Sequence, residues 1–205
     1  DSVSIPQNLR PNLSSFDFML SVKRHVVVLE TYSGSRSLSP NYVEKYLKFI
    51  VQHPKVKERF GVVEVDIIKD TVEVDRILGM ESLKELKLTI RRPNTDGWDP
   101  SVAAMVEQRL AEQNLSQIEE TLTATAENNL TPNQRTKNLA YVAAENGSVR
   151  GKAIVDGLTI NVDSASKPLK LSESYFSDDT PTKNIFFKLT YQMFELLDEM
   201  RSRLR

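Results

Sequence analysis

The segment 130–162 constrains the fold more than any other part of the chain. It reads LTPNQRTKNLAYVAAENGSVRGKAIVDGLTINV, and its first residues carry a helix-start signal. Thr131 has a suitable side chain for an N-cap, Pro132 follows at the first helical position, and Gln134 completes a capping box. Gly147 is placed to end this helix, because glycine reaches positive φ without strain. We therefore expect a capped helix between Thr131 and Gly147.

A β-hairpin is predicted directly after this helix. Two runs rich in β-branched residues flank the dipeptide Asp156-Gly157. Such a dipeptide is typical of a two-residue hairpin turn in which both residues have positive φ. The segment thus predicts a helix that leads into a hairpin.

Hydrophobic periodicity predicts the remaining elements. Alternating or β-branched runs predict strands at 15–21, 25–32, 62–68 and 83–90. Apolar positions three and four residues apart predict helices at 40–52, 102–110 and 118–126, and a last helix that opens at Thr180-Pro181. Residues 71–80 fit either a strand or a helical turn.

Strands and helices are partly segregated along the chain, which favours the α+β class over a doubly wound sheet. We expect a small, mostly antiparallel sheet with a packed helix in the N-terminal half, then a helical region with the β-hairpin and a long C-terminal helix. The turn cluster PNTDGWDP at 93–100 is the best internal boundary. It predicts a sheet-rich half at 1–92 and a helical half at 93–205, or else one continuous domain.

Composition excludes several kinds of site. The chain has a formal net charge of −1, no cysteine and seven glycines. Disulfides, thiolate zinc sites and cysteine nucleophiles are therefore absent, and no phosphate-binding glycine motif occurs. The strongly apolar run Val26 to Leu29 ends at Glu30 and is far too short to span a membrane. We predict a cytoplasmic protein without a metal, an organic cofactor or a membrane partner.

The clearest functional pattern concerns nucleic acid. Three helices followed by a hairpin is the element order of a winged helix, in which the helix at 131–146 reads the DNA groove and the hairpin is the wing. Side chains suited to bases and phosphates occur on both elements: Arg135, Lys137, Asn138, Arg150 and Lys152. Acidic residues in the neighbouring helices oppose phosphate binding, and a solvated polar face is the simpler interpretation.

Two other functions fit the sequence. Glu64 and Asp66 alternate with apolar residues in the predicted strand 62–68, so their carboxylates could share one face and hold Mg²⁺ in a metal-dependent nuclease or toxin. Alternating charge on a solvated strand face is the simpler explanation. The other alternative is a structural adaptor that dimerises through the C-terminal helix, whose apolar stripe is wide.

Two segments together resemble an uncharacterised family of bacterial proteins often met near mobile elements and phage-defence genes. They are LKELKLTIRRPNTDGWDP and AENNLTPNQRTKNLAYVAAENGSVRGKA. The resemblance covers most of the chain, but its motifs are a turn, a cap and a glycine stop, so it implies no reaction. It implies a bacterial cytosolic protein and favours a role in defence or nucleic-acid binding. We predict a non-enzymatic binding protein whose partner is DNA, RNA, another protein or a second copy of the chain.

Overall fold

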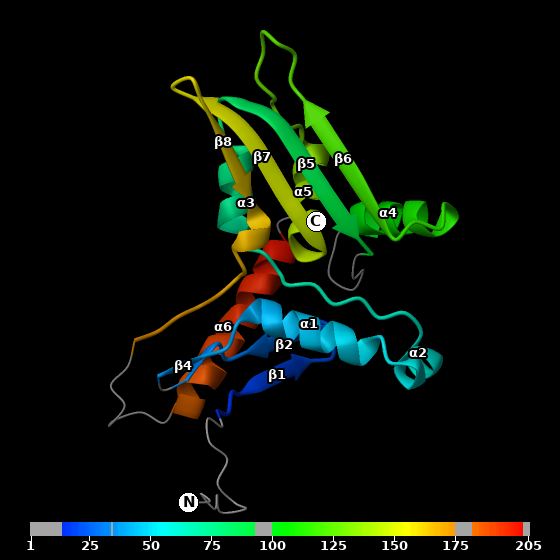
Figure 1. Ribbon diagram of the computed structural model, residues 1–205, viewed down its shortest axis with the longest axis vertical. Coiled ribbons are helices and arrows are strands. Elements are labelled where there is room, and N and C mark those ends of the chain that lie inside the picture. The colour runs from blue at the N-terminus through cyan, green and yellow to red at the C-terminus, as the bar shows by residue number, and fades with distance from the viewer. Residues whose placement is uncertain (1–13, 34, 93–99, 175–181, 203–205) are drawn as a thin grey trace, which may run out of the picture.

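The computed structural model describes residues 14–33, 35–92, 100–174 and 182–202, and it has an α+β fold (Figure 1). At its centre is a four-stranded antiparallel sheet in the order β6-β5-β7-β8. The strands are β5 (Leu83–Arg91), β6 (Gln117–Thr123), β7 (Gly147–Val155) and β8 (Leu158–Asp163). The predicted α+β class, with an antiparallel sheet and a long C-terminal helix, is confirmed.

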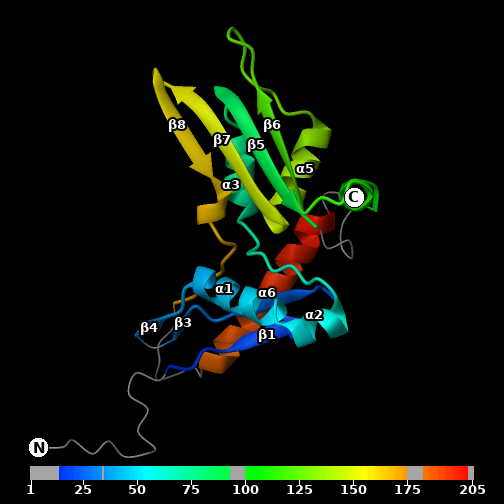
Figure 2. The same ribbon diagram turned by 45° about the vertical axis from the view of Figure 1, so that its right-hand side comes forward.

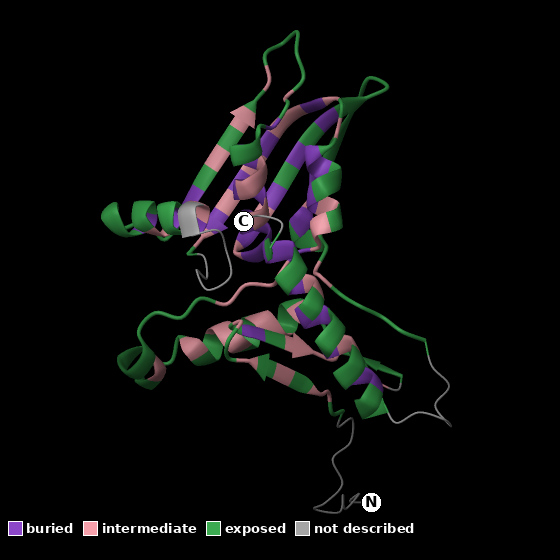
Figure 3. Cartoon of the chain, turned by 180° about the vertical axis from the view of Figure 1, so that it is seen from behind, coloured by how far each residue is buried: buried purple, intermediate pink, exposed green. Residues whose placement is uncertain are grey.

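Three helices accompany this sheet, and we call the whole unit the sheet lobe. They are α3 (Thr71–Leu78), α4 (Pro100–Glu112) and α5 (Gln134–Glu145). The view from behind shows α3 and α5 in front of the sheet, so both helices cover the same face (Figure 3). Helices and strands share one hydrophobic core, in which the side chains with no exposed surface include Val74, Ile77, Leu86, Leu88 and Val149. Removal of this apolar surface from water holds the lobe together.

The remaining elements form a second unit, which we call the hairpin lobe. It contains β1 (Phe18–Ser21), β2 (Val26–Leu29), β3 (Tyr32–Ser33), β4 (Arg36–Ser37), α1 (Pro40–Val51), α2 (Pro54–Phe60) and most of α6 (Thr182–Ser202). Its small core joins Val26 of β2 to Met193, Phe194 and Leu197 of α6. The Arg24 guanidinium donates to both oxygens of Asp198, at 3.0 and 2.5 Å. Segments from the two ends of the chain thus build this lobe together.

The long helix α6 connects the two lobes. It rises behind α1 and the β1-β2 pair and reaches the lower end of α5 (Figures 1 and 2). There Arg201 donates to both carboxylate oxygens of Glu145, at 2.9 and 3.1 Å, and both side chains are buried. None of the helices in the described ranges is long and apolar enough to cross a membrane.

Two predicted elements are wrong. Residues 118–126, predicted as a helix, contain β6 instead, because Ile118 and Leu122 face the core as alternate residues of a strand that pairs with β5 along its length. Residues 62–68, predicted as a strand, form no strand. They cross from one lobe to the other with no neighbouring strand to pair with, so their backbone forms no inter-strand hydrogen bonds. Of the predicted boundary at 93–100, residues 93–99 lie outside the described residues.

The helix of the segment 130–162 forms, but its ends differ from the prediction. Asn133, not Thr131, is the N-cap, and its side chain accepts from the Thr136 N–H at 2.9 Å. Gly147 begins β7, and glycine is needed there for space rather than for positive φ. A Cβ at this position would lie 1.9 Å from the carbonyl oxygen of Thr89 in the neighbouring strand.

The predicted hairpin is confirmed. β7 and β8 pair from Val155 opposite Leu158 down to Arg150 opposite Asp163. Asp156 and Gly157 connect them with φ of 50° and 77°, so both residues occupy the left-handed region that such a turn requires.

Candidate nucleic-acid interface

The sheet has one face covered by helices and one open face. Along β7 the residues Val149, Gly151 and Ala153 point into the core and are buried, whereas Arg150 and Lys152 between them are exposed. At Gly151 a Cβ would lie 2.6 Å from the Ile77 side chain of α3, which shows how closely α3 packs on the inner face. Arg150 and Lys152 therefore project from the opposite, open face. This face of the sheet is turned towards the viewer in Figure 1.

Neighbouring strands place polar side chains around these two cations. Lys87 of β5 lies opposite Arg150, and Glu85 lies opposite Lys152. On β8 the register places Asp163 beside Arg150, and Asn161 beside Lys152. Together they line a shallow depression of about 390 Å³, bounded by Glu85, Lys87, Arg150, Gly151, Lys152, Asn161, Val162 and Asp163.

The cations of the open face differ in their partners. Arg150 Nε lies 2.7 Å from Asp163 Oδ2, and Lys87 Nζ lies 2.7 Å from Glu119 Oε2. The hydrogen bond from Lys87, with its charge, lowers the pKa of the Glu119 carboxyl. Lys152 makes no ion pair or hydrogen bond with any residue that the structure describes. Because exposed ion pairs contribute little free energy, a phosphate can replace either carboxylate at small cost.

The five residues predicted to contact nucleic acid do not lie on one surface. Arg135, Lys137 and Asn138 lie on α5, which packs on the inner face of the sheet, so the sheet separates them from Arg150 and Lys152. Asn138 accepts from Gln134 Nε2 at 2.8 Å along the same helix. The winged-helix arrangement is not formed, because one of its three helices is the strand β6 and the hairpin belongs to the central sheet.

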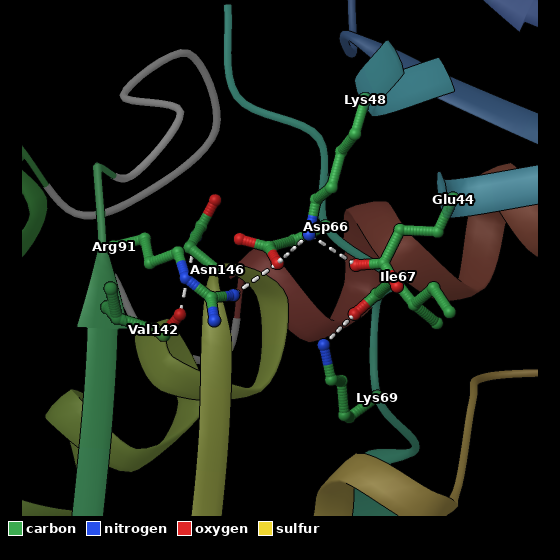
Figure 4. Close-up of polar contacts among 8 residues, drawn as sticks. All are labelled: Glu44, Lys48, Asp66, Ile67, Lys69, Arg91, Val142 and Asn146. Carbon is green, nitrogen blue, oxygen red and sulfur yellow. Dashed lines mark hydrogen bonds and ion pairs between the residues drawn. The ribbon is translucent and has the colours of Figure 1, made fainter. Parts of the chain in front are cut away.

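The carboxylates of the proposed magnesium site lie in different surroundings. Glu64 is exposed, whereas Asp66 Oδ1 accepts a hydrogen bond from Arg91 and lies 3.6 Å from Lys48 Nζ (Figure 4). Because residues 62–68 form no strand, the expected shared strand face does not exist. Within the described residues no group of three or more His, Cys, Asp or Glu side chains could hold a metal ion.

Asp66 belongs to a polar cluster at the junction of the lobes. Lys48 comes from α1, Arg91 from the end of β5, and the buried Lys69 from the segment between them (Figure 4). Lys69 Nζ donates to the carbonyl oxygen of Ile67, and burial lowers the pKa of its ammonium group. Arg91 lies on the open face, so this cluster joins α1 to the lower edge of that face.

The apolar stripe of α6 is largely used within the chain. Ile185, Phe186, Met193, Phe194 and Leu197 are buried, whereas Phe187 and Tyr191 stay exposed. The width of the stripe, which suggested dimerisation, is thus mostly explained by packing in the hairpin lobe.

Sequence reasoning missed a second surface, on α1 and α2. Tyr42, Tyr46 and Phe49 lie on α1, which the sequence predicted only as a helix. All three are exposed, and the exposed Phe60 of α2 adds a fourth ring. The signal was present in the sequence, because the positions i, i+4 and i+7 fall on one side of a helix.

The fold and its surfaces define a class: a small α+β protein whose antiparallel sheet carries helices on one face and charged side chains on the other. Residues 1–191 match the family described as Domain of unknown function (DUF4747), and the chain belongs to that family. Neither a curated protein nor a solved structure matches the chain. The predicted membership of an uncharacterised family is confirmed, while the link to mobile elements and phage defence stays a prediction.

Proposed function

We propose that this chain is a non-enzymatic nucleic-acid-binding protein that contacts the phosphate backbone with the open face of its four-stranded sheet. One observation carries the proposal: Arg150 and Lys152 project side by side from β7 into the same shallow depression, with Lys87 of β5 beside them. Lys152 has no ionic partner among the described residues, so it is ready to receive a phosphate oxygen. The nearby Asn161 amide supplies a further donor.

Electrostatics defines what kind of binding to expect. The open face also carries Glu85, Glu119 and Asp163, so its charge is nearly balanced and its attraction for phosphate is moderate. Binding is therefore expected to be detectable at low salt and to weaken as the salt concentration rises. Each phosphate contact that is removed reduces the slope of log K against log salt by about 1.

The decisive experiment compares the two faces of the sheet. Fluorescence anisotropy with labelled duplex and single-stranded oligonucleotides is measured between 20 mM and 200 mM salt. We expect Arg150→Ala/Lys152→Ala to lower the affinity at least tenfold and the salt slope by about 2. The matched control is Arg135→Ala/Lys137→Ala, which also removes two cations but on the opposite side, and it is expected to bind like the wild type.

Two outcomes would overturn the assignment. Absence of binding by the wild type at 20 mM salt removes the nucleic-acid function altogether. If only Arg135→Ala/Lys137→Ala loses affinity, the nucleic acid contacts α5 and not the open face.

We extend the proposal to bacterial phage defence, which the resemblance described above favours. Cells that express the wild type are expected to show fewer phage plaques than cells that express Arg150→Ala/Lys152→Ala at equal protein level. Equal plaque numbers across a panel of phages would remove the defence role and leave the binding proposal intact.

A further inference from the structure

The helix α1 is amphipathic, yet it presents a stripe of aromatic side chains to solvent. The exposed fractions are 69% for Tyr42, 59% for Tyr46 and 74% for Phe49. Val43 and Leu47, on the other side, are half-buried, so α1 turns its aliphatic side towards the chain. The stripe is therefore not needed to anchor α1. Large exposed aromatic surfaces that the fold does not use mark sites of interaction.

Exposed cations lie on the same helix and on the helix that follows it. Lys45 lies on α1 beside the stripe, and Lys55, Lys57 and Arg59 lie on the short helix α2 that follows. All four are exposed, and none forms an ion pair with another described residue. The Arg59 guanidinium lies 5.2 Å from the centre of the Phe60 ring, so one cation already stacks near an exposed aromatic ring.

The acidic groups on these two helices do not balance the cations. Glu44 is paired with Lys48 at 2.8 Å, which leaves Glu58 as the remaining carboxylate of α1 and α2. The His53 imidazole caps the start of α2, because its Nδ1 accepts from the Lys55 N–H at 3.3 Å. We call this set the basic-aromatic surface: Tyr42, Lys45, Tyr46, Phe49, Lys55, Lys57, Arg59 and Phe60.

We infer that the basic-aromatic surface binds single-stranded nucleic acid, with unpaired bases stacked on its rings and phosphates held by its cations. Stacking on aromatic side chains tolerates every base, because every base has a π-face. The bases of a duplex are already stacked on one another, so they are not free for these rings. A second copy of the chain fits less well, since a symmetric contact would bring two positively charged surfaces together.

The dimensions suit a short segment of strand. Tyr42 and Phe49 are seven residues apart, which is about 10 Å along a helix. Stacked bases repeat about every 3.4 Å, so the α1 rings span roughly three to four nucleotides. Phe60 and the cations of α2 lengthen the site, and we expect full affinity from an oligonucleotide of about eight nucleotides.

This site is separate from the open face of the sheet but lies next to it. Lys48 of α1 and Arg91 of β5 meet at Asp66, and Figures 1 and 2 show α1 and the open face on the same side of the molecule. The inference does not depend on the open-face proposal, because each surface has its own residues and variants. If both hold, one nucleic acid with paired and unpaired parts can contact both surfaces.

The test uses the full chain and labelled dT12, with a duplex of equal length as the second probe. We expect Tyr46→Ala/Phe49→Ala to lower the affinity for dT12 at least tenfold and to leave the duplex affinity unchanged. The matched control is Phe187→Ala/Tyr191→Ala, a pair of exposed rings one helical turn apart on α6, and it should bind dT12 like the wild type. The ring-preserving variant Tyr46→Phe/Phe49→Tyr should retain binding, which separates stacking from any effect on folding.

The inference is overturned if the wild type does not bind dT12, or if both alanine pairs bind it equally. It is also overturned if Tyr46→Ala/Phe49→Ala instead abolishes a concentration-dependent dimer in sedimentation, or binding to anionic lipid vesicles. The open-face variant Arg150→Ala/Lys152→Ala shows which proposal has failed, binding by the open face or binding by the basic-aromatic surface. It should affect the duplex, whereas the ring variant should not.

Discussion

The ion pair between Glu145 and Arg201 offers a sharp test of how the lobes are held together. Arg201 lies in the last turn of α6, and Glu145 is the last residue of α5. The Glu145 side chain is 3% exposed and the Arg201 side chain is 6% exposed. Two hydrogen bonds of 2.9 and 3.1 Å join them. We expect Arg201→Met to be strongly destabilising, because it removes both guanidinium donors from a buried carboxylate.

The magnitude follows from burial. Removal of one partner of a buried pair costs about 3–5 kcal/mol, whereas replacement of both by apolar residues is neutral or stabilises by up to about 4 kcal/mol. In a chain of this length each kcal/mol corresponds to a change in Tm of roughly 2–4 °C. Arg201→Met should therefore lower Tm by about 6–20 °C, and the added change Glu145→Met should restore most of the loss.

Thermal and urea unfolding, followed by circular dichroism at pH 7, measure the Tm and the free energy of unfolding of both variants. Arg24→Met is the control for a more exposed ion pair on α6. The control removes a partly solvated pair, so we expect it to cost about 1 kcal/mol or less. A loss below about 1 kcal/mol for Arg201→Met would refute the reasoning. So would a double variant that is less stable than the single one.

Three further predictions concern single positions. Gly147→Ala should lower the free energy of unfolding by more than about 2 kcal/mol in chemical denaturation, because its Cβ would overlap the backbone of β5. In Gly157→Ala the added Cβ meets no atom, so the only cost is that of a positive φ. Asn133→Ala should cost about 1 kcal/mol through loss of the N-cap, with Thr131→Ala near zero in the same assay. Lys69→Met should raise the free energy of unfolding at pH 7, because burial lowers the pKa of Lys69 in the folded chain and its charge is therefore unfavourable there. That gain should shrink as the pH rises towards the ordinary lysine pKa of 10.5, when both states lose the proton; a gain that grows with pH would contradict it.

The hairpin could be predicted because its signal is local. Asp156-Gly157 permits the two left-handed residues of a tight turn, and no distant contact is needed to decide this. Arg150 and Lys152 were correctly placed on one strand, and their spacing of two puts them on one face. The sequence could not say which face, because that depends on the approach of α3 to Gly151.

The error at β6 has a simple physical origin. Ile118 and Leu122 are four residues apart, a spacing that fits both a helix turn and alternate positions of a strand. Pairing with β5 decides between them, and this partner lies about 30 residues earlier in the chain. The loss of that helix is also what removed the winged-helix arrangement.

The helix cap illustrates a finer ambiguity. Thr131 and Asn133 both carry suitable capping side chains, with Pro132 between them. Pro132 is buried in the structure, so it belongs to the packed approach to the helix rather than to its first turn. Burial of this kind depends on tertiary packing and leaves no local trace in the sequence.

The basic-aromatic surface leaves only part of its signal in the sequence. Tyr42, Tyr46 and Phe49 follow helical periodicity, and lysines lie between and after them. The same pattern is typical of a buried helix face, however, and only the exposure of the three rings in the folded chain separates the two. Exposure depends on how much of α1 the β1-β2 pair and α6 can cover, which composition does not reveal.

The way in which the hairpin lobe is assembled has a consequence for biosynthesis. Arg24 and Asp198 are 174 residues apart in the chain, yet they pair across the core that β2 shares with α6. At about 5–20 residues per second, a ribosome needs roughly 10–35 s to make the intervening chain. During that time Val26 and its neighbours have no α6 to pack against. The strands of the sheet lobe come from a shorter span of the chain, so they can pair first. The hairpin lobe then folds last. A translating ribosome that is stalled before α6 should therefore carry a protease-sensitive N-terminal segment on an already protected sheet.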